Sequence, residues 1–140
     1  MRIPLLALLV LCPSCLSLSG DPTPEPGEVH YLEVVTTEVD QVCATYEATI
    51  GVEFGTPDEG LGSARTALLP DGGSIGVRAP MSDQELPVVR PYFLVDDIEA
   101  AVAAAEAAGA VIALPPMEIP GHGRCAIYFQ TGVQFGLWEL

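Results

Sequence analysis

The chain has 140 residues and a formal net charge of −14, because 19 acidic residues face only five arginines and no lysine. A surface with this excess of negative charge repels phosphate backbones, so we expect no nucleic-acid partner. The same acidity helps to keep an exported chain soluble, and it would mildly favour a cationic ligand.

Residues 1–20 have the composition of a signal peptide. One arginine precedes a short apolar run and a small-residue exit, and the run is too short to cross a bilayer as a helix. Ser17-Leu18-Ser19 fits an ordinary cleavage site, whereas Ser14-Cys15 weakly resembles a lipobox, in which Cys15 is acylated after cleavage nearby. We therefore expect an exported protein, either a soluble periplasmic protein or a lipoprotein whose only membrane contact is the lipid on Cys15.

A Pro-rich acidic linker at residues 21–27 separates the export segment from residues 28–140. The second stretch is long enough for one hydrophobic core and too short for two domains. Of the four cysteines, Cys43 and Cys125 lie in this domain. Sequence alone does not establish whether these two residues are close enough to pair, and we expect two unpaired thiols.

Residues 31–51 and 90–109 have the same pattern, displaced by 59 residues along the chain. Each segment has a β-branched and aromatic run, then a helical stripe of apolar residues, then a glycine that ends the helix. Thr37 with Asp40, and Asp96 with Glu99, have the spacing of helix N-terminal caps. About three short strand-like runs follow each helix. We predict an α+β domain of two tandem β-α-β-β-β modules.

Four segments of this domain resemble the vicinal oxygen chelate superfamily, which includes glyoxalase I, bleomycin-resistance proteins and extradiol dioxygenases. The segments are EVVTTE (33–38), VDDIEAAV (95–102), PPMEIPGHGR (115–124) and FGLWE (135–139), and they are most like those of glyoxalase-like proteins often labelled "hydroxylase". The resemblance implies a curved, cup-like mixed sheet with helices on its outer face and a ligand cavity between the modules. It also implies a homodimer.

The first strand of each module supplies the main candidates for ligand binding. Alternation places Glu33 on the face opposite Leu32 and Val34, which would pack on the first helix through Val39, Val42, Tyr46 and Ile50. In the repeat, Arg90 and Tyr92 take the positions of Tyr31 and Glu33, so a pseudo-two-fold axis would bring Glu33 and Arg90 to one cavity. Such an arginine–carboxylate pair can anchor a polar ligand or serve as an internal strut.

The last two strands supply further candidates. Alternation places Arg124, Ala126 and Tyr128 on one face of the first of these strands, and in the look-alike family Arg124 would line the cavity. On the final strand Gln134, Gly136 and Trp138 would face inward. The predicted ligand-binding residues are therefore Glu33, Arg90, Tyr92, Arg124, Tyr128 and Trp138.

The resemblance also bears on metal binding. Metal-dependent members of the superfamily place His or Gln on the first strand of each module and Glu on the last, and these positions fall here on Tyr31, Arg90 and Gly136. Arginine only donates hydrogen bonds and cannot ligate a cation. His30 is adjacent to an expected position but points to the other face, and His122 lies in a loop. We expect no divalent metal and no other cofactor, with His30 and His122 as the only histidine candidates.

Three functions remain open after the sequence is read. The first, which we favour, is metal-independent binding of a small molecule between the modules. The second is a glyoxalase- or isomerase-type enzyme that uses Glu33 as a catalytic base, with Arg90 or a tyrosine polarising a carbonyl group. The third is an exported interaction domain without a ligand. The chain has no nucleophile elbow and no dinucleotide fingerprint, and fold alone cannot decide among the three.

Overall fold

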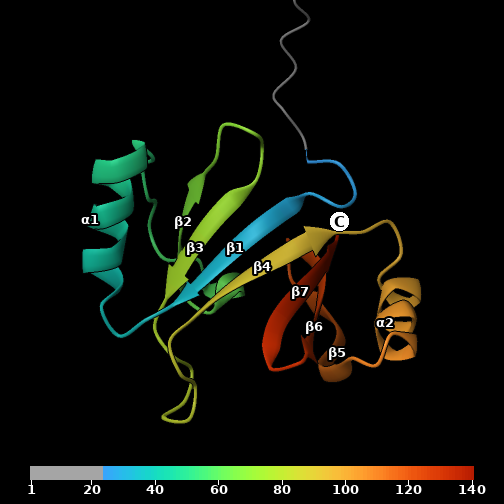
Figure 1. Ribbon diagram of the computed structural model, residues 1–140. Coiled ribbons are helices and arrows are strands. Elements are labelled where there is room, and N and C mark those ends of the chain that lie inside the picture. The colour runs from blue at the N-terminus through green and yellow to red at the C-terminus, as the bar shows by residue number, and fades with distance from the viewer. Residues whose placement is uncertain (1–23) are drawn as a thin grey trace, which may run out of the picture.

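The computed structural model describes residues 24–140 (Figure 1). The predictions that concern the signal peptide, its cleavage and the lipidation of Cys15 lie outside the described residues. Within residues 24–140, none of the helices is both long enough and apolar enough to span a membrane.

The order of elements confirms the predicted internal repeat. It is β1 (Val29–Val35), α1 (Val39–Ile50), the 3-10 helix η1 (Glu59–Leu61), β2 (Arg65–Leu68), β3 (Ser74–Arg78), β4 (Val88–Leu94), α2 (Ile98–Ala107), β5 (Val111–Ile119), β6 (Gly123–Gln130) and β7 (Val133–Glu139). The bounds of β1 and β4 differ by 59 residues at both ends. Two modules of similar architecture therefore follow one another in the chain.

The first module has two strands after its helix where three were expected. The segment between α1 and η1 forms no strand. Side chains satisfy its backbone instead: the Phe54 N–H donates to Glu47 Oε1 at 3.3 Å, and the Arg65 guanidinium donates to the carbonyl oxygens of Phe54 and Gly55. The backbone groups of Phe54 and the carbonyl of Gly55 are thus bonded to side chains instead of to a neighbouring strand.

The seven strands form one curved sheet in the order β2-β3-β1-β4-β7-β6-β5. The modules meet where β1 runs antiparallel to β4, and each first strand lies parallel to the last strand of its own module. Figure 1 shows α1 and α2 at opposite ends of this sheet. The predicted α+β architecture is confirmed.

Three buried clusters fill the two sides of the sheet. One joins α1 to β1 and β3 through Val34, Cys43, Ile75 and Val77, and another joins α2 to β6 and β7 through Ile98, Val102, Ala126 and Leu137. The third lies on the inner face and includes Tyr31, Tyr92, Leu94, Cys125 and Trp138. The predicted packing of Leu32 and Val34 on the first helix is confirmed, except that Ile50 is exposed.

The helix caps differ from the predicted ones. Asp97 caps α2, accepting a hydrogen bond from the Ala100 N–H at 2.9 Å, whereas Asp96 was expected to do so. Because the cap lies one residue later, Glu99 is not the third residue after it and pairs with Arg124 instead. At α1 the N-cap is Glu38, without a side-chain hydrogen bond, so the expected cap from Thr37 does not form.

Candidate functional site

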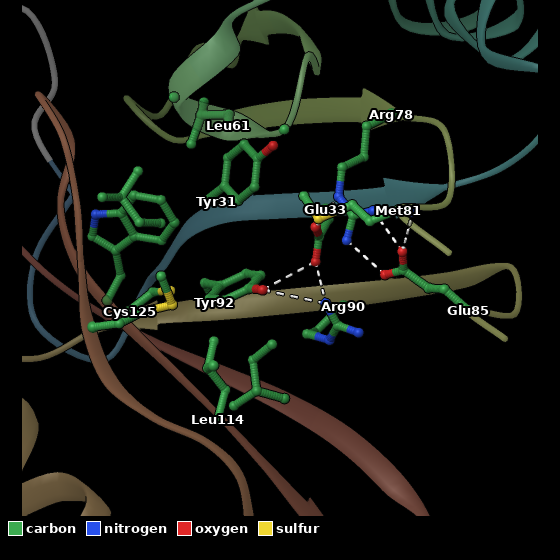
Figure 2. A pocket seen from close by; sticks show the side chains of 16 residues that line it. Tyr31, Glu33, Leu61, Arg78, Met81, Glu85, Arg90, Tyr92, Leu114 and Cys125 are labelled. Carbon is green, nitrogen blue, oxygen red and sulfur yellow. Dashed lines mark hydrogen bonds and ion pairs between the residues drawn. The ribbon is translucent and has the colours of Figure 1, made fainter. Parts of the chain in front are cut away.

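A cavity of about 380 Å³ opens on the inner face of the sheet, between the two modules. Its apolar walls come from both modules. Leu61 belongs to the short helix η1 of the first module, and Leu114, Ile119 and Ile127 come from β5 and β6 of the second. Four charged side chains, from β1, β3, β4 and the segment between β3 and β4, stand at one end of the cavity (Figure 2). The cavity therefore has a long apolar part and a compact charged end.

Glu33 lies at the centre of the charged end and is only 6% exposed. Its carboxylate accepts hydrogen bonds from Arg78 Nε at 2.6 Å, from the Tyr92 hydroxyl at 3.0 Å and from Arg90 Nη1. Glu33 and Arg90 are partners in the β1–β4 register, so the predicted meeting of these two residues is confirmed. Arg90 is held from its other side by Gln134 Oε1.

Arg78 and Glu85 complete the charged end, and the sequence analysis missed both. Arg78 is 4% exposed and donates from Nη1 and Nη2 to the two Glu85 oxygens at 2.8 and 2.7 Å. This pairing lowers the pKa of the Glu85 carboxyl to about 2. In the sheet register, Arg78 takes the position in the first module that Trp138 takes in the second. These two residues are 60 positions apart, one more than the displacement of the repeat in the sequence, so the repeat did not align them. Glu85 lies in an irregular segment, where the sequence has no periodic signal.

Three aromatic side chains meet beside the charged end. The ring centroids of Tyr31, Tyr92 and Trp138 lie 5.4–5.8 Å apart, and Trp138 Nε1 donates to the His122 carbonyl oxygen at 2.7 Å. Burial raises the pKa of both tyrosines, so both hydroxyls stay protonated at neutral pH. Within residues 24–140 the Tyr31 hydroxyl has no hydrogen-bond partner, although it belongs to the cavity lining. It is therefore free to bond a ligand.

Comparisons with known proteins agree with this architecture. No family model matches the chain. A protein of Mycobacterium bovis and one of Mycobacterium tuberculosis, both provisionally named glyoxylase CFP32, are each 30% identical to it over 107 residues, which is 74% of this chain and 40% of theirs. The chain thus spans less than half the length of these relatives.

Solved structures provide the comparison of folds. The hypothetical protein BH1468 of Bacillus halodurans superposes with a TM-score of 0.65 at 14% identity, over 83% of this chain and 96% of that one. Methylmalonyl-CoA epimerase of Mycobacterium tuberculosis superposes with a TM-score of 0.58 at 17% identity, over 78% of this chain and 85% of the epimerase. The chain has the vicinal oxygen chelate fold. The resemblance seen in the sequence is confirmed at this level.

The positions at which metal-dependent members of the vicinal oxygen chelate superfamily hold a cation do not fit a metal here. Tyr31 and Arg90 occupy the first-strand positions, and the last-strand positions hold Gly76 and Gly136. A Cβ atom at Gly76 would overlap the Tyr31 ring, and one at Gly136 would overlap the Tyr92 ring. The space that a ligand carboxylate would need is thus filled by tyrosine. Among residues 24–140, no three His, Cys, Asp or Glu side chains are grouped as a metal site.

The two histidines contact different parts of the domain. The His30 ring lies 5.5 Å from the Trp138 ring, its buried Nδ1 has no hydrogen-bond partner among residues 24–140, and burial lowers its pKa. His122 Nε2 lies 2.9 Å from Asp58 Oδ2 and so joins a loop of the second module to a loop of the first. Neither contact brings the two imidazoles into one site.

Arg124 and Tyr128 do not line the cavity, which corrects the prediction for both. Residue Cys125 on β6 pairs with Trp138 on β7, and side chains of paired residues point to the same side of a sheet. Cys125 and Ile127 therefore face the cavity. Arg124 instead pairs with Glu99 and Glu139. Tyr128 stacks on Phe135 against the α2 cluster.

The cysteines of the described domain lie on opposite sides of the sheet, and both are free. Cys43 is buried beneath α1, and burial raises the pKa of its thiol. Cys125 lines the cavity, and burial raises its pKa to about 11. Because the thiolate is the reactive form, Cys125 is a weak nucleophile at neutral pH.

Proposed function

We propose that this domain binds a small, largely apolar molecule in the cavity between its two modules, without a metal ion. The observation that carries the proposal is the cavity itself: about 380 Å³ of space with apolar walls and few polar groups. Ligand sites in proteins generally combine a concave apolar surface with a small number of placed polar groups. Here, among residues 24–140, the Tyr31 hydroxyl is a lining polar group that makes no hydrogen bond.

The charged end of the cavity supports ligand binding because its side chains bond mainly to one another. Each guanidinium makes four hydrogen bonds to neighbouring groups, for Arg78 with Glu33, Glu85 and Ala79, and for Arg90 with Glu33, Tyr92 and Gln134. Little donor capacity is left, since a guanidinium has five N–H groups. The network thus holds the two modules together and leaves the apolar part of the cavity for the ligand.

Relatives of the fold are consistent with this function. A Streptomyces coelicolor methylmalonyl-CoA epimerase, with a TM-score of 0.59 and 18% identity over 82% of this chain, was solved in complex with 2-nitronate-propionyl-CoA. That protein demonstrates that a domain of this fold accommodates a small molecule.

An enzyme that uses Glu33 as a base has less support from the geometry. Both carboxylate oxygens already accept hydrogen bonds, and Arg90, the expected polarising group, is bonded to Glu33, Tyr92 and Gln134. A general base needs an oxygen within hydrogen-bond reach of the proton it removes. Glu33 would first have to leave one of its partners.

The test uses Trp138, the single tryptophan of the chain, which lines the cavity. We expect its fluorescence to change saturably when small aromatic and aliphatic fragments are titrated into the protein, with the same affinities in EDTA and in Zn²⁺ or Mn²⁺. Leu114→Phe, which fills the cavity, should weaken binding at least tenfold. Leu68→Phe on β2, where Leu68 is 80% exposed, is the matched control and should bind normally.

Two outcomes would overturn the proposal. If no fragment binds the unmodified protein, the domain is better explained as an interaction module without a ligand. If fragments bind equally well to the Leu114→Phe variant, their site lies outside the cavity.

A further inference from the structure

Glu85 differs from the other charged residues of the cavity in where it comes from. Glu33, Arg78 and Arg90 belong to strands of the sheet, whereas Glu85 lies in the segment 79–87 that connects β3 to β4. Figure 2 shows Glu85 reaching back from this connection to Arg78. Its side chain is 22% exposed, compared with 5% for Arg78.

Segment 79–87 has few attachments to the rest of the domain. Glu85 also accepts a hydrogen bond from the Met81 N–H at 2.7 Å, and the Glu85 N–H donates to the Ser82 carbonyl, so these bonds stay within the segment. Among the described residues, every hydrogen bond from this segment to the remainder of the protein goes to Arg78. Large side chains such as Met81 and Leu86 are exposed. The ion pair with Arg78 is therefore the main polar tie that holds the segment in place.

The charges around the cavity balance only while Glu85 is present. Two guanidinium groups, Arg78 and Arg90, face two carboxylates, Glu33 and Glu85. Without Glu85 the buried cluster would carry a net positive charge, and an unpaired buried charge is costly. A carboxylate in this place is thus required, whether it comes from the chain or from a ligand.

The geometry of Arg78 suits a ligand carboxylate. Its Nε is used by Glu33, so the edge formed by Nη1 and Nη2 is the edge that Glu85 occupies from the cavity side. Two parallel N–H groups match the two oxygens of a carboxylate. The net charge of −14 disfavours a polyanion near this surface, so a single carboxylate fits better than a phosphate ester.

We propose that Glu85 holds the place of a ligand carboxylate. A small monocarboxylic acid with an apolar body displaces Glu85 from Arg78, and its apolar part lies against Leu61 and Leu114. Segment 79–87 then moves away from the mouth of the cavity. This inference rests on the proposed function, because it requires that the cavity takes up a small molecule.

The first test is chemical rescue. Glu85→Ala leaves Nη1 and Nη2 of Arg78 without a carboxylate, while Nε keeps its bond to Glu33. We expect formate or acetate to raise the melting temperature of this variant saturably, more than NaCl does at the same ionic strength. Glu99→Ala is the matched control, because it removes one of the two carboxylate partners of the half-exposed Arg124, outside the cavity, and should show no rescue. If Glu85→Ala does not fold, Glu85→Gln is used in the same way. A variant that responds to carboxylates no more than to NaCl would overturn the inference.

The second test separates this inference from the proposed function. Benzoate and its uncharged analogue benzamide are titrated into the unmodified protein and into Glu85→Gln, with Trp138 fluorescence as the readout. We expect benzoate to bind the variant at least tenfold more tightly than the unmodified protein, and benzamide to bind both equally. If benzamide binds both but benzoate gains nothing in the variant, the carboxylate site is excluded while the cavity function stands. If benzamide binds neither and the fragment titration also fails, the proposed function itself is wrong.

Discussion

Glu33 is held by three donors in a nearly closed site, and its loss would leave two guanidinium groups facing one carboxylate. Removing one partner of a buried ion pair costs about 3–5 kcal/mol of unfolding free energy. We therefore expect Glu33→Gln to be destabilised by about that amount in urea unfolding. The comparison is Glu99→Gln at the exposed Arg124 pair, which should lose less than about 1 kcal/mol. Equal losses would contradict a buried strut at Glu33.

Glu85 gives a prediction about acid stability. The hydrogen bonds from Arg78 lower its pKa from 4.5 to about 2, so the carboxylate contributes stability above about pH 4.5 and loses it as the pH falls towards 2. We expect Glu85→Gln to be less stable than the unmodified protein at pH 6, and the difference to shrink between pH 4.5 and pH 2. Unfolding free energies measured at several pH values test this, and a difference that stays constant with pH would exclude the pairing.

For single residues, the sequence predicted a contact correctly where the internal repeat related a residue of one module to a residue of the other. Glu33 and Arg90 were expected to meet because the pseudo-two-fold axis of the repeat would bring both residues to one cavity, and the β1–β4 register confirms that they are partners. The prediction failed for Arg124 and Tyr128, since alternation groups residues by face without saying which face is inside. Glu85 was missed because a long connection has no period, and its partner is fixed only by tertiary structure.

At the scale of elements, α2 depends on a cap that α1 lacks. Asp97 accepts the Ala100 N–H, and replacing such a cap by alanine costs about 1 kcal/mol. We expect Asp97→Ala to lose roughly this much in thermal or urea unfolding. Thr37→Ala, at the start of α1, removes no cap and should stay close to the unmodified stability. A Thr37→Ala loss as large as that of Asp97→Ala would show that the assigned caps are wrong.

The helices and most strands could be predicted from the sequence. The spacing of their apolar residues and the turn residues at their ends match the elements of the fold. The exception is that two strands follow α1 where about three were expected. Arg65 and Glu47 bond the backbone of residues 54–55 from a distance in sequence, which no local pattern indicates. Side chains that replace a neighbouring strand are recognised only once the chain has folded.

For the whole molecule, the residues at the metal positions of the fold predict how metal ions affect its stability. The positions that would hold a cation carry Tyr31, Arg90, Gly76 and Gly136. We expect Zn²⁺, Mn²⁺ or Fe²⁺ to leave the melting temperature unchanged, and elemental analysis of the purified protein to find less than stoichiometric metal. A stoichiometric metal with a raised melting temperature would mean that other residues form a site.

The two tyrosine–glycine contacts also restrict which sequence changes this domain can accept. A carboxylate at position 136 collides with the Tyr92 ring, whereas a smaller residue at position 92 removes a donor from Glu33 and leaves a void. Each change is harmful by itself and tolerable only alongside the other, so their energies are not additive. Conversion of this site into a metal centre would therefore require coupled substitutions at both positions rather than a series of single neutral steps.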